Sequence, residues 1–369
     1  NLGNAYDSLG ENQRAIEFFQ QSLEIFRDIG DRFGVGSSLN NLGNAYYSLG
    51  EYQRAIEFYQ QSLEIKREIG DRNGVGSSLN NLGNAYNSLG EYQRAIEFYQ
   101  QSLAIFREIG DRFGVGSSLN NLGNAYDSLG EYQRAIEFYQ QSLEIKREIG
   151  DRNGVGNSLK SLGNAYNSLG EYQQAIEFHQ QSLEIFRDIG DRNGVGRSLI
   201  GLGNAYYSLG EYQRAIEFYQ QSLEISRDIG DRNGVGNSLN NLGNAYSCLG
   251  EYQRAIELFQ QSLEISREIG DHHGEGNSLM ALSIAYNQCG RIQEGFAASY
   301  QAQQIFQELE LPFEAMPYPQ WLKSLIKFAQ RGKLQLILCF IFGLIAFPFA
   351  LVWLILLLLW RLMRSQFRR

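Results

Sequence analysis

Proline, tryptophan, histidine and cysteine are scarce in this sequence of 369 residues, and their positions are uneven. All four prolines and all three tryptophans lie beyond Leu311, so the long first part lacks the residue that most strongly breaks helices. The three cysteines are far apart and give no disulfide framework: Cys248, Cys289 and Cys339. Of the three histidines, His272 and His273 are adjacent, whereas metal ligands on a helix are expected one turn apart. These absences exclude a disulfide-stapled domain and argue against a metal site.

Sequence motifs of known reaction centres are missing as well. The recurring GDRNGVG segment resembles the start of an EF-hand loop, but Leu82 stands where the loop needs a bidentate glutamate. GVG is not a phosphate-binding loop either, because no strand precedes it and no Lys-Ser/Thr follows it. We therefore predict that the chain is not an enzyme and that it has no catalytic residues, no cofactor and no metal.

Charge divides the chain at Leu311. The whole chain has a formal net charge of −9, and the residues after Leu311 carry eight Lys/Arg and one acidic residue, which leaves −16 for the first part. Nucleic-acid affinity comes largely from Lys and Arg, so an acidic array argues against nucleic acid as a partner. The same charge favours a basic or amphipathic protein segment over an acidic one.

The dominant feature is a 40-residue sequence that is repeated seven times and an eighth time in altered form from Ala281. From Asn41 it reads NLGNAYYSLGEYQRAIEFYQQSLEIKREIGDRNGVGSSLN. A period of this length predicts a solenoid, in which each unit buries its apolar face against its neighbours. The chain opens without Met, and Asn1 falls inside a repeat, so we expect a fragment or a processed product whose first repeat is truncated.

Each repeat contains two helical patterns separated by glycine. In the second copy, Gly50 and Gly70 suit helix C-terminal caps and Asp71 suits the N-cap of a helix from about residue 72 to 89. Apolar residues fall at helical spacing in both segments: Tyr52, Ala55, Ile56, Tyr59 and Leu63 in one, and Leu79, Leu82, Ala85, Tyr86 and Leu89 in the other. We predict an all-α fold of antiparallel helix pairs, with helices of roughly 17–18 residues.

These residues carry a family resemblance. Leu42-Gly43, Tyr46, Ala55 and Tyr59 stand at the spacing of the tetratricopeptide repeat signature, although Leu39 replaces the usual tryptophan. The 40-residue period is longer than usual, and in this the sequence resembles kinesin light chains, the Pins-type adaptors with Leu-Gly-Asn repeats, and bacterial tetratricopeptide proteins. The resemblance covers residues 1–311 and implies a superhelical solenoid whose first helix in each pair lines a concave, protein-binding face.

Asparagines recur on that first helix, away from the apolar stripe. A side-chain amide both donates and accepts hydrogen bonds, so a row of amides suits the backbone of an extended peptide. The predicted peptide-binding residues on the concave face are Asn41, Asn44, Asn81, Asn84, Asn121, Asn124, Asn164, Asn204, Asn241 and Asn244. The alternative is that Asn44 and its equivalents bond between adjacent hairpins and hold the stack together.

Positions that vary on the same helix face are the candidates for ligand specificity. They are Tyr47, Asn87, Asp127, Lys160 and Tyr207, with Asn167, Ile200 and Met280 at equivalent places. The altered eighth unit, from residue 281 to 311, is interpreted as a C-terminal cap because a terminal repeat has no neighbour on one side.

Beyond the repeats lies the one long apolar run, residues 334–360. Its 27 residues exceed the roughly 20 that a helix needs to cross a bilayer, so it predicts a C-terminal transmembrane helix. Pro348 in the middle leaves a hairpin dipping into one leaflet as an alternative, and a buried soluble helix as another. Residues 312–333 are interpreted as a proline-containing linker and a short amphipathic helix that lies at the membrane surface or packs on the last repeat. Residues 361–369 form a basic tail, and four basic residues on each side of the run leave the orientation open.

The sequence therefore predicts a membrane-anchored scaffold with cytoplasmic repeats that bind extended or helical peptide segments of other proteins. Two other interpretations stay open. Near-identical repeats could associate with further copies of the same chain, or they could be the regulatory part of a larger signalling protein whose N-terminal domain precedes Asn1.

Overall fold

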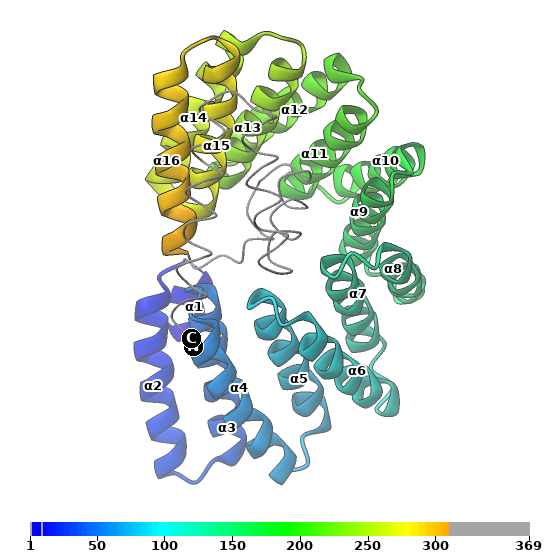
Figure 1. The fold of residues 1–369 in the computed structure, drawn as a ribbon. Helices are drawn as coiled ribbons and strands as arrows, with labels where there is room; N and C mark the ends of the chain where they lie inside the picture. The colour runs from blue at the N-terminus through cyan, green and yellow to red at the C-terminus, as the bar shows by residue number, and fades with distance from the viewer. Residues whose placement is uncertain (1, 9, 310–369) are drawn as a thin grey trace, which may run out of the picture. The chain divides into compact units, whose positions relative to one another are not determined.

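The computed structural model describes residues 2–8 and 10–309, and every regular element among them is an α-helix (Figure 1). The helices are α1 (Leu2–Ser8), α2 (Asn12–Asp28), α3 (Arg32–Ser48), α4 (Tyr52–Glu68), α5 (Arg72–Ser88), α6 (Tyr92–Glu108), α7 (Arg112–Ser128), α8 (Tyr132–Glu148), α9 (Arg152–Leu169), α10 (Tyr172–Asp188), α11 (Arg192–Ser208), α12 (Tyr212–Asp228), α13 (Arg232–Cys248), α14 (Tyr252–Ile269), α15 (His272–Gln288) and α16 (Ile292–Glu308). None of these helices is long and apolar enough to cross a membrane. The predicted linker, transmembrane segment and basic tail, residues 312–369, lie outside the described residues.

The predicted helix lengths, the start of the helix at residue 72 and the caps are confirmed. From α2 onward each helix has 17 or 18 residues, and α5 begins at Arg72. The Asp71 carboxylate accepts a hydrogen bond of 2.9 Å from the backbone amide of Gly74, one of the amides at a helix start that has no partner within the helix. Gly50 and Gly70 have φ of 78° and 73°, a left-handed conformation that glycine adopts without steric cost. The glycine and aspartate between the helices of each repeat therefore end one helix and start the next.

One residue of the predicted apolar stripe is placed differently. Leu79, Leu82 and Ala85 are buried as predicted, but Leu89 is 39% exposed. Leu89 is the C-cap residue of α5, where the chain leaves the helix and turns away from the core. The predicted helix was therefore one residue too long at its C-terminal end.

The described chain divides into two units, residues 1–251 and a second that starts at Tyr252. In the first unit each odd-numbered helix from α1 to α11 packs on the even-numbered helix that follows it, and that helix packs on the next odd-numbered helix. In the second unit α14 packs on α15, and α15 packs on α16. Each unit is thus a stack of antiparallel helices joined by short turns.

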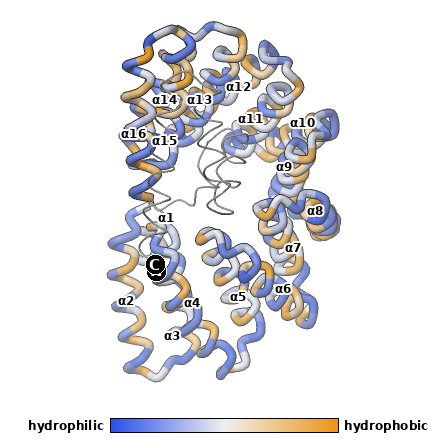
Figure 2. The backbone as a smooth tube through the Cα atoms, viewed as in Figure 1, coloured by the Kyte–Doolittle hydropathy of each residue, from blue (hydrophilic) through white to orange (hydrophobic). Residues whose placement is uncertain are grey.

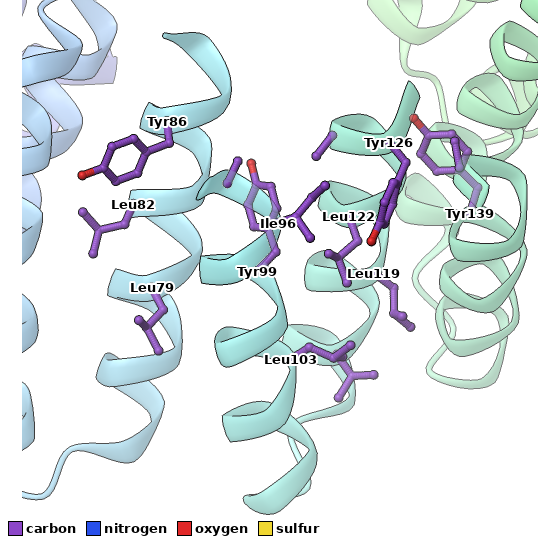
Figure 3. Close-up of a cluster of buried hydrophobic side chains, with 14 of the residues drawn as sticks. Leu79, Leu82, Tyr86, Ile96, Tyr99, Leu103, Leu119, Leu122, Tyr126 and Tyr139 are labelled. Atoms are coloured by element: carbon purple, nitrogen blue, oxygen red, sulfur yellow. The ribbon is translucent and has the colours of Figure 1, made fainter. Parts of the chain in front are cut away.

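The core of the first unit is a repeating set of aliphatic and aromatic side chains. Leu79 and Leu82 from α5 pack with Ile96 and Tyr99 from α6, and Leu122 from α7 continues the cluster (Figure 3). Along each helix, apolar and polar segments alternate (Figure 2). This pattern is the one expected when only one side of each helix is buried.

The even-numbered helices begin with an ion pair instead of a capping side chain. In α4, Arg54 binds Glu51 at 2.7 Å and lies 5.5 Å from the centre of the Tyr46 ring, and Tyr46 in turn stacks on Phe58 at 5.3 Å. The arrangement recurs in most copies, but α10 has Gln174 in place of the arginine. A cation over an aromatic face at an exposed site contributes about 0.5–1 kcal/mol.

The altered eighth hairpin, α15 and α16, exposes a set of large apolar side chains. Ile284, Ile292, Phe296 and Tyr300 are between 53% and 65% exposed. In the regular repeats the position of Phe296 holds a buried isoleucine, such as Ile256, whereas the position of Tyr300 holds an exposed glutamine. The interpretation of this unit as a cap stays a prediction, and its outer face is more apolar than a cap needs.

Lys146 is a buried lysine at a position that phenylalanine occupies in other copies of the repeat. Lys146 is 8% exposed and lies against Gly154, as Phe106 lies against Gly114 and Phe186 against Gly194. Burial lowers the pKa of the Lys146 ammonium, since the charged form loses its hydration. We expect Lys146→Phe to raise the free energy of unfolding by about 1–2 kcal/mol, because it replaces a desolvated cation by an apolar ring.

Urea denaturation of the full chain in nonionic detergent, followed by circular dichroism, measures this effect. Lys66→Phe is the matched control and should gain less, because the Lys66 ammonium donates a hydrogen bond of 3.1 Å to the Ser78 hydroxyl. Equal gains at both positions, or a loss at Lys146, would contradict the prediction.

Candidate functional site

The odd-numbered helices of the first unit share one face. Besides their hairpin partners, α5 touches α7, α7 touches α9, α9 touches α11, and α11 touches α13. Figure 1 shows α7, α9 and α11 on the inner side of the stack and α8 and α10 on the outer side. We call the side of α3, α5, α7, α9, α11 and α13 that lies toward this inner side the inner face.

The predicted peptide-binding asparagines and specificity residues all lie on these odd-numbered helices. Every one of them is half-buried except Asn164, which is exposed: Asn41, Asn44, Tyr47, Asn81, Asn84, Asn87, Asn121, Asn124, Asp127, Lys160, Asn164, Asn204, Tyr207, Asn241 and Asn244. The sequence spacing therefore placed them on one side of the stack, next to the core and still in reach of solvent.

In most copies a tyrosine of the same hairpin forms a hydrogen bond with one asparagine of this set. The Tyr59 hydroxyl donates a hydrogen bond of 2.8 Å to Asn44 Oδ1, 15 residues earlier in the chain. The same bond, with the same length, joins Tyr99 to Asn84, Tyr139 to Asn124 and Tyr219 to Asn204. The tyrosine ring is itself buried, so the amide is fixed in one orientation by the core.

A second set of bonds links neighbouring hairpins. Asn81 Nδ2 donates to Asn40 Oδ1 at 3.2 Å and to Asn44 Oδ1 at 3.5 Å, and Asn121 Nδ2 donates to Asn80 and Asn84 at 3.1 and 3.2 Å. We call this chain of amides the asparagine ladder. It gives Asn44 and Asn84 the stacking role that was the alternative to peptide binding.

The ladder still leaves hydrogen-bonding capacity unused. Asn44 accepts through Oδ1, and within the described residues its Nδ2 makes no hydrogen bond. Asn81 donates through Nδ2, and its Oδ1 has no partner within the same part of the chain. Asn84 on the same helix as Asn81 accepts through Oδ1 as Asn44 does, so free amide donors and free amide acceptors both lie along the inner face, where an extended backbone can complement them.

Buried acceptors near the ladder also lack donors. In the described part of the chain, the Oδ1 atoms of Asn87, Asn120, Asp127, Asn167 and Asn240 are buried without a hydrogen bond. Such atoms cost free energy unless a donor reaches them, so they are unusual in a native interior. Burial raises the pKa of the Asp127 carboxyl for the same reason.

Two specificity candidates connect to the next hairpin. The Tyr47 hydroxyl lies 2.9 Å from Ser88 Oγ, and the Tyr207 hydroxyl lies 3.1 Å from Cys248 Sγ. Each also packs against a second ring, Tyr47 against Tyr52 and Tyr207 against Tyr212. These tyrosines therefore hold the spacing between hairpins as well as presenting a polar tip.

Sequence reasoning missed one participant, His179 of α10. It occupies the position of Tyr99 and Tyr139 and is buried as they are, but its Nδ1 has no partner among the described residues. Burial and the nearby Lys160 lower the pKa of His179 to about 4, so the imidazole is neutral. The only signal in the sequence was the single substitution of histidine for tyrosine within otherwise repeated letters. Over residues 2–8 and 10–309 no cluster of side chains has the make-up of a metal site.

This geometry defines an all-α repeat solenoid of stacked helix pairs with a polar inner face. The family model of the tetratricopeptide repeat matches residues 1–68, 74–148, 154–228 and 234–308. The chain belongs to the tetratricopeptide repeat family, as its Leu-Gly-x-x-Tyr signature predicted.

Several solved structures share this fold. BtubC (BKLC) from P. vanneervenii is 23% identical, and the match covers 59% of this chain and 92% of that one with a TM-score of 0.53. The quorum sensor NprR from B. thuringiensis is 14% identical, with 83% and 86% covered and a TM-score of 0.64. A Rap protein in complex with competence and sporulation factor is 14% identical, with 80% and 85% covered and a TM-score of 0.58. No curated protein matches the sequence. Identities this low show a common fold alone.

Proposed function

We propose that this chain is a membrane-tethered scaffold that binds extended segments of partner proteins along the inner face. The observation that carries the proposal is the asparagine ladder, which keeps one amide donor and one amide acceptor free on successive hairpins. An extended strand of backbone offers carbonyl and amide groups in alternation, so it can pair with such a row without any particular sequence. The Rap structure, in which a protein of this fold is complexed with competence and sporulation factor, supports the proposal by analogy.

Rigidity is the second support. The ladder amides are held by buried tyrosine hydroxyls at 2.8 Å, so they need little reordering when a partner binds. Binding surfaces that are already ordered lose less conformational entropy on association. The same positions therefore stabilise the stack and present the free amide groups.

The test replaces three predicted peptide-binding asparagines of the inner face together, Asn81, Asn121 and Asn241, by alanine. A library of extended peptides is screened against the immobilised full chain in nonionic detergent, and the affinity of the best peptide is measured by fluorescence anisotropy. Because three backbone hydrogen bonds are lost, we expect the triple variant to bind about tenfold or more weakly. The control replaces Gln61, Gln101 and Gln141, which are exposed on even-numbered helices, and should leave the affinity unchanged. If the asparagine variant keeps full affinity for every peptide, the ladder does not bind peptides.

The membrane tether rests on residues 334–360 of the sequence. A 27-residue apolar run flanked by basic residues is long enough to span a bilayer with some tilt. The test compares the full chain with a chain that ends at residue 333, after membranes are washed with high salt and alkaline carbonate. We expect only the full chain to stay with the membranes, and release of the full chain into the wash would reject the tether.

A further inference from the structure

A cavity of about 300 Å³ is lined by residues of α8, of α10 and of the first half of α9. Figure 1 shows α8 and α10 on the outer side of the stack, and no predicted peptide-binding or specificity residue lines the cavity. Its apolar part consists of Val155 and Leu159, which are buried, and Ile185, which is half-buried. A volume at the lower end of the roughly 300–1,000 Å³ range of ligand sites suits a small molecule better than a peptide segment.

The Lys146 side chain reaches this cavity along a fixed path. Its stem passes between two glycines of the neighbouring helices. An added Cβ atom would lie 3.4 Å from Lys146 Cγ at Gly116 of α7, and 2.7 Å from Lys146 Cδ at Gly154 of α9. The ammonium is therefore held in place by packing before any ligand arrives, which lowers the entropic cost of binding.

The Lys146 ammonium has no hydrogen bond and no ion pair with any residue that the structure describes. Its Nζ atom is not among the sealed atoms that lack a partner, so it is open to the cavity. Asp151 attracts the ammonium, but that carboxylate caps α9 and accepts a hydrogen bond of 2.8 Å from the Gly154 amide. The equivalent Lys66 donates to the Ser78 hydroxyl at 3.1 Å. A largely buried cation without an acceptor costs free energy, which an anionic ligand would recover.

The other charged groups of the cavity leave a positive excess. Arg152 is paired with Asp188 at 2.9 Å. Arg147 is exposed and makes no ion pair within the described residues, and Glu184 is the exposed acidic residue of the lining. Two unpaired cations, Lys146 and Arg147, thus face one carboxylate, in an array whose net charge is −16. A positive site in an acidic array favours an anionic ligand at this place.

We propose that this cavity binds a small organic anion whose acidic group pairs with Lys146 and Arg147. The apolar body of the ligand covers Val155, Leu159 and Ile185. The acidic group is a carboxylate or a phosphate, since both present several oxygens to an ammonium and a guanidinium. The site lies on other residues than the asparagine ladder, so it is independent of the proposed function and either can fail without the other.

Isothermal titration calorimetry on the full chain in nonionic detergent measures the binding of four probes: benzoate, phenyl phosphate, benzamide and inorganic phosphate. Benzamide has the shape of benzoate without its charge, and inorganic phosphate has the charge without an apolar body. Lys146→Phe is the main variant. Phenylalanine at this position is expected to stabilise the fold, so a loss of binding cannot be attributed to unfolding. Lys66→Phe makes the same change in a copy whose lysine already has a partner, and it should leave the affinities unchanged.

We expect benzoate, phenyl phosphate or both to bind with a Kd of about 1 mM or tighter. The ratio of their affinities shows whether the site prefers a carboxylate or a phosphate. Benzamide and inorganic phosphate should bind about tenfold or more weakly than the preferred organic anion. Lys146→Phe should weaken the binding of that anion by at least about tenfold, because the charge-assisted bond to the ammonium is lost.

Glu184→Ala separates the effect of charge from that of shape. Alanine occupies the same position in an earlier copy, as Ala104. Removal of the acidic group should strengthen the binding of the organic anion about threefold and leave benzamide unaffected.

The inference is wrong if benzamide binds as tightly as benzoate, or if inorganic phosphate binds as tightly as phenyl phosphate. It is also wrong if Lys146→Phe keeps the affinity of the wild type. Binding of neither organic anion would show that water alone fills the cavity.

Discussion

Gly123→Ala should lower the free energy of unfolding by about 1–3 kcal/mol, although alanine is the better helix former. A Cβ atom at Gly123 in α7 would lie 2.5 Å from Cε1 and 2.6 Å from Cδ1 of Tyr139. The ring is buried and its hydroxyl is bonded to Asn124 Oδ1 at 2.8 Å, so it cannot turn aside without losing that bond. An added Cβ at position 123 of α7 would therefore clash with a ring of α8 that is held in place.

Gly196→Ala is the matched control. Gly196 also lies within an odd-numbered helix, but the nearest atom to an added Cβ is 3.7 Å away, an ordinary contact distance. Here the helix preference of alanine should prevail and raise the free energy of unfolding by about 0.5–1 kcal/mol. Urea denaturation of the full chain measures both variants, and a destabilising Gly196→Ala or a neutral Gly123→Ala would contradict the packing described here.

His179 should lower the free energy of unfolding at acidic pH. Its pKa is lowered to about 4 in the folded chain, below the ordinary value of 6.5, so the unfolded chain binds the proton first as the pH falls. The contribution is fully present above about pH 6.5 and is lost toward pH 4. From neutral pH to about pH 4 we expect a loss of about 2–3 kcal/mol from this residue.

The measurement compares the wild type with His179→Phe and His179→Tyr across that pH range. His179→Phe removes the titration, and His179→Tyr also restores the hydroxyl that holds asparagine in four other copies. Other titrating groups are common to all three chains, so they cancel in the comparison. The stability gap between either variant and the wild type should widen as the pH falls, and a constant gap would show that His179 does not titrate as described.

The helices and their ends were predictable because the responsible residues are local. Gly70 and Asp71 act through the backbone of their own turn, and the buried leucines follow helical spacing, so no knowledge of the neighbouring hairpin was needed. The error at Leu89 arose because periodicity does not show where the chain leaves the helix. Family membership followed from the spacing of Leu42, Gly43 and Tyr46.

The candidate site was predictable only in part. The sequence placed the asparagines on one face, but the Tyr59–Asn44 bond depends on how two helices pack, and the Asn81–Asn40 bond depends on how two hairpins stack. The joint around Lys160 and His179 was less visible still. Lys160, His179 and Gly201 are separated by up to 41 positions in the chain, and only the fold shows that His179 lies near the other two.

A photo-crosslinking experiment tests the central claim that the inner face binds a protein segment. The best peptide from the screen carries a benzophenone group, is irradiated with the full chain, and its adducts are mapped by mass spectrometry. We predict adducts on the odd-numbered helices α5, α7, α9 and α11, and far fewer of them in the Asn81, Asn121 and Asn241 alanine variant. Adducts confined to even-numbered helices, or an unchanged pattern in that variant, would contradict the account.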